Sequence, residues 1–203
     1  MKWNAQGNLR LGSNVVELLL LQRRPFLMVD GVESFLAEPR PTLESVRHIS
    51  ANEDVFDGHI AGLHVWPAAF TIEGLGQSAL LLIAILAIRR AAQAEGSDPD
   101  AALDALRNLE RGYRLQPGYR PEEAAEFVRK LRAAQPRVAL GTSVEMKFPR
   151  PVFAGQRLDY RVELTGEHAG GVRFAAEASV ERTVVASGVM MGALVSQPMF
   201  PDS

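Results

Sequence analysis

The chain has 203 residues, of which 47% are hydrophobic, so it is long enough to bury the core of one domain. Its 22 basic and 24 acidic residues nearly balance, which predicts no overall attraction for nucleic acid and leaves local patches to attract any charged partner. The absence of cysteine excludes disulfides, thiolate nucleophiles and cysteine-based zinc sites, and we expect a cytoplasmic protein.

The beginning of the chain predicts a short helix and two strands. Ser13 or Asn14 is the candidate helix cap, and a turn containing Pro39 and Pro41 separates the strands. The expected ranges are 14–22 for the helix and 26–37 and 41–49 for the strands.

A long helix is expected from Pro67 to about residue 93. Proline suits the first position of a helix, because its missing N–H needs no partner there. The helix is apolar nearly all round, which is typical of a helix inside a core. Its uncharged run 79–88 is too short to cross a bilayer, so no membrane span is expected.

The second half predicts an insertion and then four strands. We expect one domain over 1–203 with a helical insertion at 95–136, in which two helices are joined by the loop Gly112–Arg120. The helices are expected at 100–111 and 121–133, and the strands at 138–149, 157–166, 171–181 and 183–195. A long helix flanked by strands indicates an α+β fold.

The most informative segment runs from Gly58 to Gln77. It places His59 in a glycine-flanked loop, and Glu73 fourteen residues later in the apolar helix. An unpaired buried charge is costly, so Glu73 needs a reason to be there, and acid–base chemistry with His59 supplies one. Gln77 lies one turn after Glu73 on the same helix face and is placed to hydrogen-bond the carboxyl group.

This segment resembles the active-site segment of the FabZ-type 3-hydroxyacyl-acyl-carrier-protein dehydratases. The family reads Gly-His-Phe-Pro-Gly, then Met-Pro-Gly, then a helix with Glu and, four residues later, Gln. The segments 25–32 and 147–158 are similar to two further strands of the family. The residues that fall in register without a gap are His59, Gly62, Val65, Pro67, Glu73 and Gln77.

The resemblance implies a hotdog fold, a curved antiparallel sheet wrapped around one long central helix, here with an inserted helical hairpin. It implies dehydration of 3-hydroxyacyl thioesters of acyl carrier protein, without a cofactor, in fatty-acid or secondary-metabolite (polyketide-like) biosynthesis. His59 and Glu73 are the implied catalytic residues, contributed by different subunits of a dimer. The Ala68 N–H is the implied donor to the thioester carbonyl, with Gly62 and Gln77 positioning the substrate.

Several further expectations concern the surroundings of this site. Burial of Glu73 would favour its neutral, protonated form, and His59 is the natural base near neutral pH. His64, Trp66 and Phe70 are expected to line the acyl tunnel. The histidine spacing matches no standard zinc site, so no metal is expected. A basic rim is expected to attract the acidic carrier protein, with candidates Arg89, Arg90, Lys147, Arg150 and Arg157.

Two other functions remain open. The chain departs from the family at Ile60-Ala61, which replace Phe-Pro, and at Ala68, which replaces glycine. One alternative is therefore a weakly catalytic or non-catalytic hotdog subunit that binds carrier protein or a partner subunit. Another is a hotdog thioesterase or enoyl hydratase. The assembly is expected to be a homodimer or a heterodimer with another hotdog subunit, with a higher oligomer also open.

Overall fold

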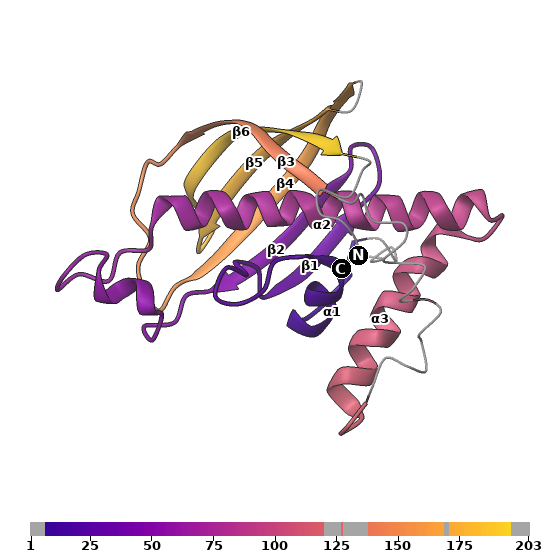
Figure 1. The fold of residues 1–203 in the computed structure, drawn as a ribbon, viewed down its shortest axis with the longest axis horizontal. Helices are drawn as coiled ribbons and strands as arrows, with labels where there is room; N and C mark the ends of the chain where they lie inside the picture. The colour runs from indigo at the N-terminus through magenta and orange to yellow at the C-terminus, as the bar shows by residue number, and fades with distance from the viewer. Residues whose placement is uncertain (1–6, 120–126, 128–137, 169–170, 196–203) are drawn as a thin grey trace.

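The computed structural model describes residues 7–119, 127, 138–168 and 171–195, and one antiparallel sheet dominates this part (Figure 1). Its six strands have the order β1-β2-β4-β5-β6-β3. They are β1 (Gly31–Leu36), β2 (Thr42–His48), β3 (Val138–Lys147), β4 (Arg157–His168), β5 (Gly171–Val180) and β6 (Thr183–Val195). All six predicted strands are confirmed, although the first begins at Gly31, five residues later than expected.

The long helix α2 (Ala68–Ala94) lies across this sheet, as Figure 1 shows, and the sheet curves around it. It packs mainly against β2 and β4. Alternate β4 side chains are buried, namely Leu158, Tyr160, Val162 and Leu164. The arrangement is the expected α+β hotdog architecture. By length and composition α2 could cross a membrane, but 72% of its most apolar window is buried inside the protein, as befits a core helix.

The contact between α2 and β4 is closest at Gly74. A β-carbon at this position would overlap the Tyr160 ring and hydroxyl group, so glycine is required there. The Tyr160 hydroxyl is buried and has no hydrogen-bond partner in the part of the chain that the structure describes. Desolvation by this burial raises the pKa of Tyr160 above its ordinary value.

The short helix α1 (Ser13–Leu19) begins at a different cap from the one predicted. Gly12 is the N-cap, and neither Ser13 nor Asn14 caps the helix. The Gly12 N–H instead donates to the Glu110 carboxylate at 2.7 Å, across 98 residues of sequence. A carboxylate from another element therefore takes the capping role that sequence neighbours usually fill.

The carboxylate of Glu110 comes from α3 (Pro99–Leu115), the first helix of the insertion. This helix turns back from the C-terminal end of α2 (Figure 1) and packs against α1 and α2. Its fully buried apolar side chains are Leu103, Leu106 and Leu109. The insertion therefore contributes part of the hydrophobic core, because three leucines on one face need a partner surface.

The predicted loop Gly112–Arg120 is wrong in its first part, because α3 continues through Gly112 to Leu115. The Tyr119 ring packs directly on Gly112, where a β-carbon would overlap it, so this glycine makes room for a side chain rather than ending the helix. The second predicted insertion helix, 121–133, lies outside the described residues except for position 127.

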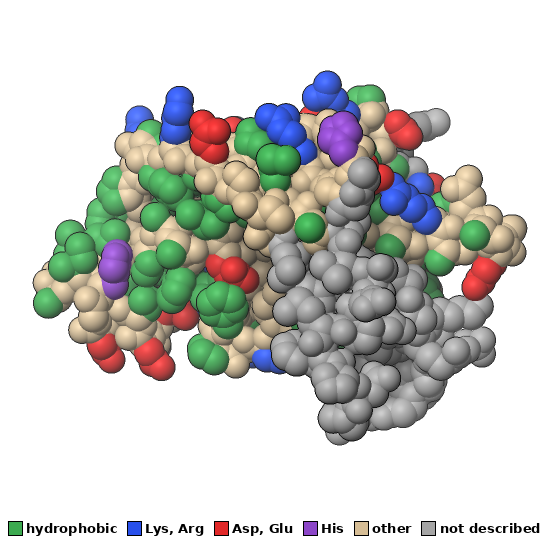
Figure 2. All heavy atoms as spheres, turned by 45° about the horizontal axis from the view of Figure 1, so that its top comes forward, with side chains coloured by type: hydrophobic (Ala, Val, Ile, Leu, Met, Phe, Trp, Pro, Cys, Tyr) green, Lys and Arg blue, Asp and Glu red, His purple; other side chains and the backbone are tan. Residues whose placement is uncertain are grey.

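The two edges of the sheet differ. At the β1 edge, an isolated bridge pairs Leu11 with Val32. At the other edge, β3 and its neighbours expose large apolar side chains, namely Val144, Phe148 and Met191. Figure 2 shows hydrophobic side chains gathered on the half of the molecule that carries the loop before α2, whereas Lys and Arg follow the top edge.

Candidate active site

His59 follows the short helix η1 (Asp54–Asp57) and is half-buried. Its Nδ1 lies 2.8 Å from the main-chain oxygen of Val65. A carbonyl oxygen can only accept a hydrogen bond, so Nδ1 carries the proton and Nε2 of the neutral imidazole is left as the base. The fold therefore selects the tautomer that proton abstraction requires.

The segment after His59 is tied to the chain that precedes β4. Trp66 N donates to the oxygen of Val152 at 2.8 Å, and Ala154 N donates to the oxygen of His64 at 3.1 Å. Between them, Val65 forms an isolated bridge with Phe153. The Val65 carbonyl that orients His59 is thus held from both sides. Gly62 has φ +80°, a left-handed conformation that favours glycine.

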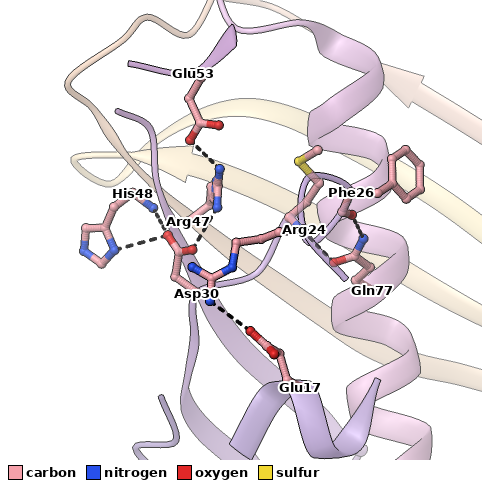
Figure 3. Close-up of polar contacts among 9 residues, drawn as sticks. Glu17, Arg24, Phe26, Asp30, Arg47, His48, Glu53 and Gln77 are labelled. Atoms are coloured by element: carbon pink, nitrogen blue, oxygen red, sulfur yellow. Dashed lines mark hydrogen bonds and ion pairs between the residues drawn. The ribbon is translucent and has the colours of Figure 1, made fainter. Parts of the chain in front are cut away.

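A single arginine on β2 contacts both ends of this loop, and Figure 3 shows its pairs with Asp30 and Glu53. Arg47 forms an ion pair with Glu53, immediately before η1, and a second with Asp30 at 2.8 Å. Its guanidinium carbon lies 5.7 Å from the centre of the Trp66 ring, immediately before Pro67. The Arg47 side chain is only 12% exposed. Sequence reasoning missed this residue, because its three partners lie in separate segments.

Aromatic side chains pack beneath the loop. The rings of Phe56 and His64 are stacked at 5.2 Å, and Trp66 contacts Phe56 at 6.1 Å and Phe70 at 5.3 Å. His64 itself is exposed. These contacts support the loop from the side of η1.

His59 shares a cavity of about 260 Å³ with the N-terminal end of α2. Ala68 is the first residue of that helix, so its N–H has no carbonyl to bond within the helix. The helix dipole adds partial positive charge at this end. Trp66, Phe148, Arg150 and Val185 line the same cavity. The structure therefore brings the predicted base and the predicted carbonyl donor together.

Glu73 lies five residues, or about one and a half turns, further along α2. Gln77 Nε2 donates to Glu73 Oε1 at 2.8 Å. It also donates to the Phe26 oxygen at 2.7 Å (Figure 3), and Gln77 Oε1 accepts from Met28 N at 2.8 Å. Gln77 is fully buried and orients the carboxyl group, as predicted. Glu73 is half-buried, not buried as expected, because it lies on the side of α2 that faces a cavity.

This second cavity has a volume of about 230 Å³ and is bordered by α2 and the strands β3, β5 and β6. Its apolar lining includes Ile72, Leu80, Ile83, Val144, Val172, Phe174, Met190 and Met191. His59 lines one of these two cavities and Glu73 the other, so neither cavity holds both the predicted acid and the predicted base among the described residues. Of the predicted tunnel residues, Trp66 lines the His59 cavity, whereas His64 and Phe70 line neither.

Comparisons with known proteins identify a family of related sequences. Residues 20–106 match the model of the FabA-like domain. The 3-hydroxyacyl-acyl-carrier-protein dehydratase FabZ of Aeromonas hydrophila subsp. hydrophila is 37% identical over 36% of this chain and 48% of that protein, so the chain spans about half the length of that relative. The FabZ dehydratase of Yersinia pestis (strain Pestoides F) is 30% identical over 90% of this chain and 78% of that protein.

A solved structure shares the fold at low sequence identity. The dehydratase heterocomplex ApeI:P from Xenorhabdus doucetiae superposes with a TM-score of 0.52 at 15% identity, over 89% of this chain and 90% of that chain. The Yersinia match extends over most of both proteins, so the assignment to a family rests on sequence as well as on fold. The chain belongs to the FabZ family of 3-hydroxyacyl-acyl-carrier-protein dehydratases.

Proposed function

We propose that this protein removes water from 3-hydroxyacyl thioesters of acyl carrier protein and forms trans-2-enoyl thioesters. The observation that carries the proposal is the Glu73–Gln77 pair at an apolar cavity, in a chain whose His59 is held as the Nε2 base beside a helix N-terminus. The two groups have the chemistry of a general acid and a general base.

The reaction follows from these groups without a redox step. His59 Nε2 takes a proton from C2 of the acyl chain, while the thioester carbonyl accepts a hydrogen bond from the Ala68 N–H. The electron pair of the broken C2–H bond forms the C2=C3 double bond. The C3–O bond breaks, and the hydroxyl leaves as water with a proton from Glu73. A proton returned from the imidazolium to the carboxylate restores both groups.

The complete site requires two chains in this proposal. Within one chain His59 and Glu73 line separate cavities, and among the described strands β3, next to the Glu73 cavity, is an edge strand with exposed apolar side chains beside it. A second hotdog subunit beside β3 would place its own catalytic histidine, His59 in a second copy of this chain, opposite Glu73. That subunit is a second copy of this chain or a different hotdog chain, in a dimer or higher oligomer.

The carrier protein is proposed to dock beside the His59 cavity. Arg150 lines that cavity, and Lys147 is exposed at the end of β3. The other candidates are less suitable. Arg89 is 14% exposed and pairs with Asp100, while Arg90 and Arg157 pair with Glu167 and Asp159. A cytoplasmic location and a role in fatty-acid or secondary-metabolite synthesis complete the proposal.

The competing proposal is a subunit that binds carrier protein without turnover. Ala68 supports it, because its methyl group lies at the cavity where the family has glycine. One experiment separates these functions from thioesterase activity. The protein is incubated with 3-hydroxyacyl carrier proteins of several chain lengths, and each carrier is weighed by mass spectrometry. Loss of one water supports dehydration, release of the acyl group supports a thioesterase, and no change in mass at any chain length contradicts the proposed enzyme.

A further inference from the structure

The cavity beside Glu73 holds one more polar side chain, for which the dehydratase mechanism above has no role. Among the described residues that line the cavity, all side chains are apolar or absent except those of Glu73 and Gln22. Gln22 precedes β1, in a segment where the sequence analysis found no candidate. An amide in an otherwise apolar lining calls for a polar partner.

Gln22 Oε1 is buried and has no hydrogen-bond partner in the part of the chain that the structure describes. A buried acceptor without a partner destabilises the folded protein. A bound ligand is one explanation for such an atom, and the cavity beside Gln22 is where a ligand would lie.

The position of Gln22 links it to Glu73. A turn closed by Phe26 N donating to the Arg23 oxygen at 2.8 Å keeps Gln22 close to Phe26. The Phe26 oxygen accepts from Gln77 Nε2 (Figure 3), which also donates to Glu73. The segment that carries Gln22 is thus attached to the same turn of α2 as the carboxylate.

We infer that Gln22 binds the 3-hydroxyl group of the substrate, an inference that rests on the proposed dehydration. An amide oxygen needs a donor. The thioester carbonyl only accepts, and the acyl methylenes offer no donor, whereas the 3-hydroxyl has one O–H. That hydroxyl must lie against Glu73, which protonates its oxygen. A rotation of the Gln22 amide, whose Oε1 is buried in the free chain, lets this oxygen accept from the hydroxyl hydrogen while the hydroxyl oxygen receives the proton from Glu73.

This contact gives Gln22 a role in specificity. A 3-hydroxyacyl chain satisfies the buried amide, whereas a saturated or 2-enoyl chain of the same length leaves it unpaired. Sites built to hydrogen-bond a hydroxyl group discriminate against ligands that lack it for this reason. The same amide accepts from the departing water, and it is unpaired again once water has left, which favours release of the enoyl product.

The test compares Gln22→Met, which keeps the length of the side chain and removes the acceptor, with Gln93→Met, a change at an exposed glutamine near the C-terminal end of α2. Both changes are made in a His59→Ala background, where the missing base prevents turnover. The affinities for a 3-hydroxyacyl and a saturated acyl pantetheine thioester of equal chain length are measured by calorimetry, together with the melting temperature.

Gln22→Met is expected to weaken binding of the 3-hydroxyacyl thioester about fivefold, the effect of one neutral hydrogen bond, and to leave the saturated thioester unchanged or tighter. The melting temperature of the free protein should hold or rise, because an unpaired acceptor is removed. Equal effects on both thioesters, or none on either, would overturn the inference. If the protein with His59 intact removes no water, the proposed function fails. If Gln22→Met still weakens binding of the 3-hydroxyacyl thioester and not of the saturated one, the Gln22 contact stands.

Discussion

The guanidinium carbon of Arg47 lies 5.7 Å from the centre of the Trp66 ring, while its nitrogens pair with Asp30 and Glu53. Glu53 comes immediately before η1, and Trp66 comes two residues before α2. One side chain on β2 therefore anchors both ends of the loop that carries His59. The guanidinium group suits this role, because its planar fork can bind carboxylates and stack on an aromatic ring together.

Arg47→Met should lower the free energy of unfolding by about 3 kcal/mol, because two carboxylates lose their partner at a largely buried position. Arg47→Lys keeps the charge but not the fork, so we expect a smaller loss of stability and a clear fall in kcat. Chemical unfolding and initial rates measure the two effects. The control is Arg40→Met, whose exposed pair with Glu163 should contribute less than about 1 kcal/mol. Equal losses at Arg40 and Arg47 would contradict the anchoring role.

His59→Ala and Glu73→Gln should each lower the dehydration rate by a factor of about 10² or more, the usual contribution of a general acid or base. Mixing the two inactive proteins after partial unfolding tests whether the site spans two chains. A hybrid dimer then keeps one intact site, so random assembly restores roughly a quarter of the wild-type rate. Absence of any restored activity, with hybrid dimers demonstrated by mass spectrometry, would place both groups in one chain.

Reversal of the charges at Lys147 and Arg150 should weaken the docking of carrier protein. The double change to Glu is expected to lower kcat/KM for acyl carrier protein substrates about tenfold at low ionic strength, since charge complementarity mainly raises the association rate. Small pantetheine thioesters should react as before. Arg111→Glu on α3, also exposed, controls for the change in total charge. A similar loss with small thioesters would point to damage of the His59 cavity instead.

Tyr160→Phe should leave the free energy of unfolding unchanged or raise it by up to about 1 kcal/mol, because the buried hydroxyl has no partner among the described residues.

The raised pKa of Tyr160 also makes the stability of the wild-type protein depend on pH. The folded state holds this proton longer than the unfolded chain, so wild-type stability falls as pH rises above the ordinary tyrosine value of about 10. Tyr160→Phe should lack that part of the fall, as urea unfolding between pH 8 and about 11 would reveal. A marked loss of stability at pH 7 would show that the hydroxyl is hydrogen-bonded.

The insertion helix should matter for stability more than for the choice of acyl chain. Leu106→Ala on α3 is expected to cost about 3 kcal/mol, because a fully buried leucine leaves a cavity against its neighbours. No residue of α3 is among those that line the Glu73 cavity. The preference among acyl chain lengths should therefore stay the same, as competition between thioesters would measure. A shifted preference would show that the insertion reaches the acyl tunnel.

The sequence by itself determined the local elements and the chemical residues of the site. Period-two burial in β4 and the apolar length of α2 are local patterns, so they predicted both elements without any knowledge of the neighbours. The spacing of His59, Glu73 and Gln77 predicted acid–base chemistry for the same reason. The Gln77–Glu73 bond was also within reach of sequence reasoning, because residues four apart share a helix face.

Only the tertiary structure decided which distant groups meet. The Glu110 carboxylate caps α1 from 98 residues away, and Arg47 joins three separate segments, so neither contact has a local signature. Burial is likewise a property of the packed chain. Glu73 is half-exposed because a cavity lies beside it, and Gln22 lines that cavity because a turn holds its segment against α2. Sequence patterns record what each residue prefers, whereas cavities and long-range contacts arise only when the elements pack together.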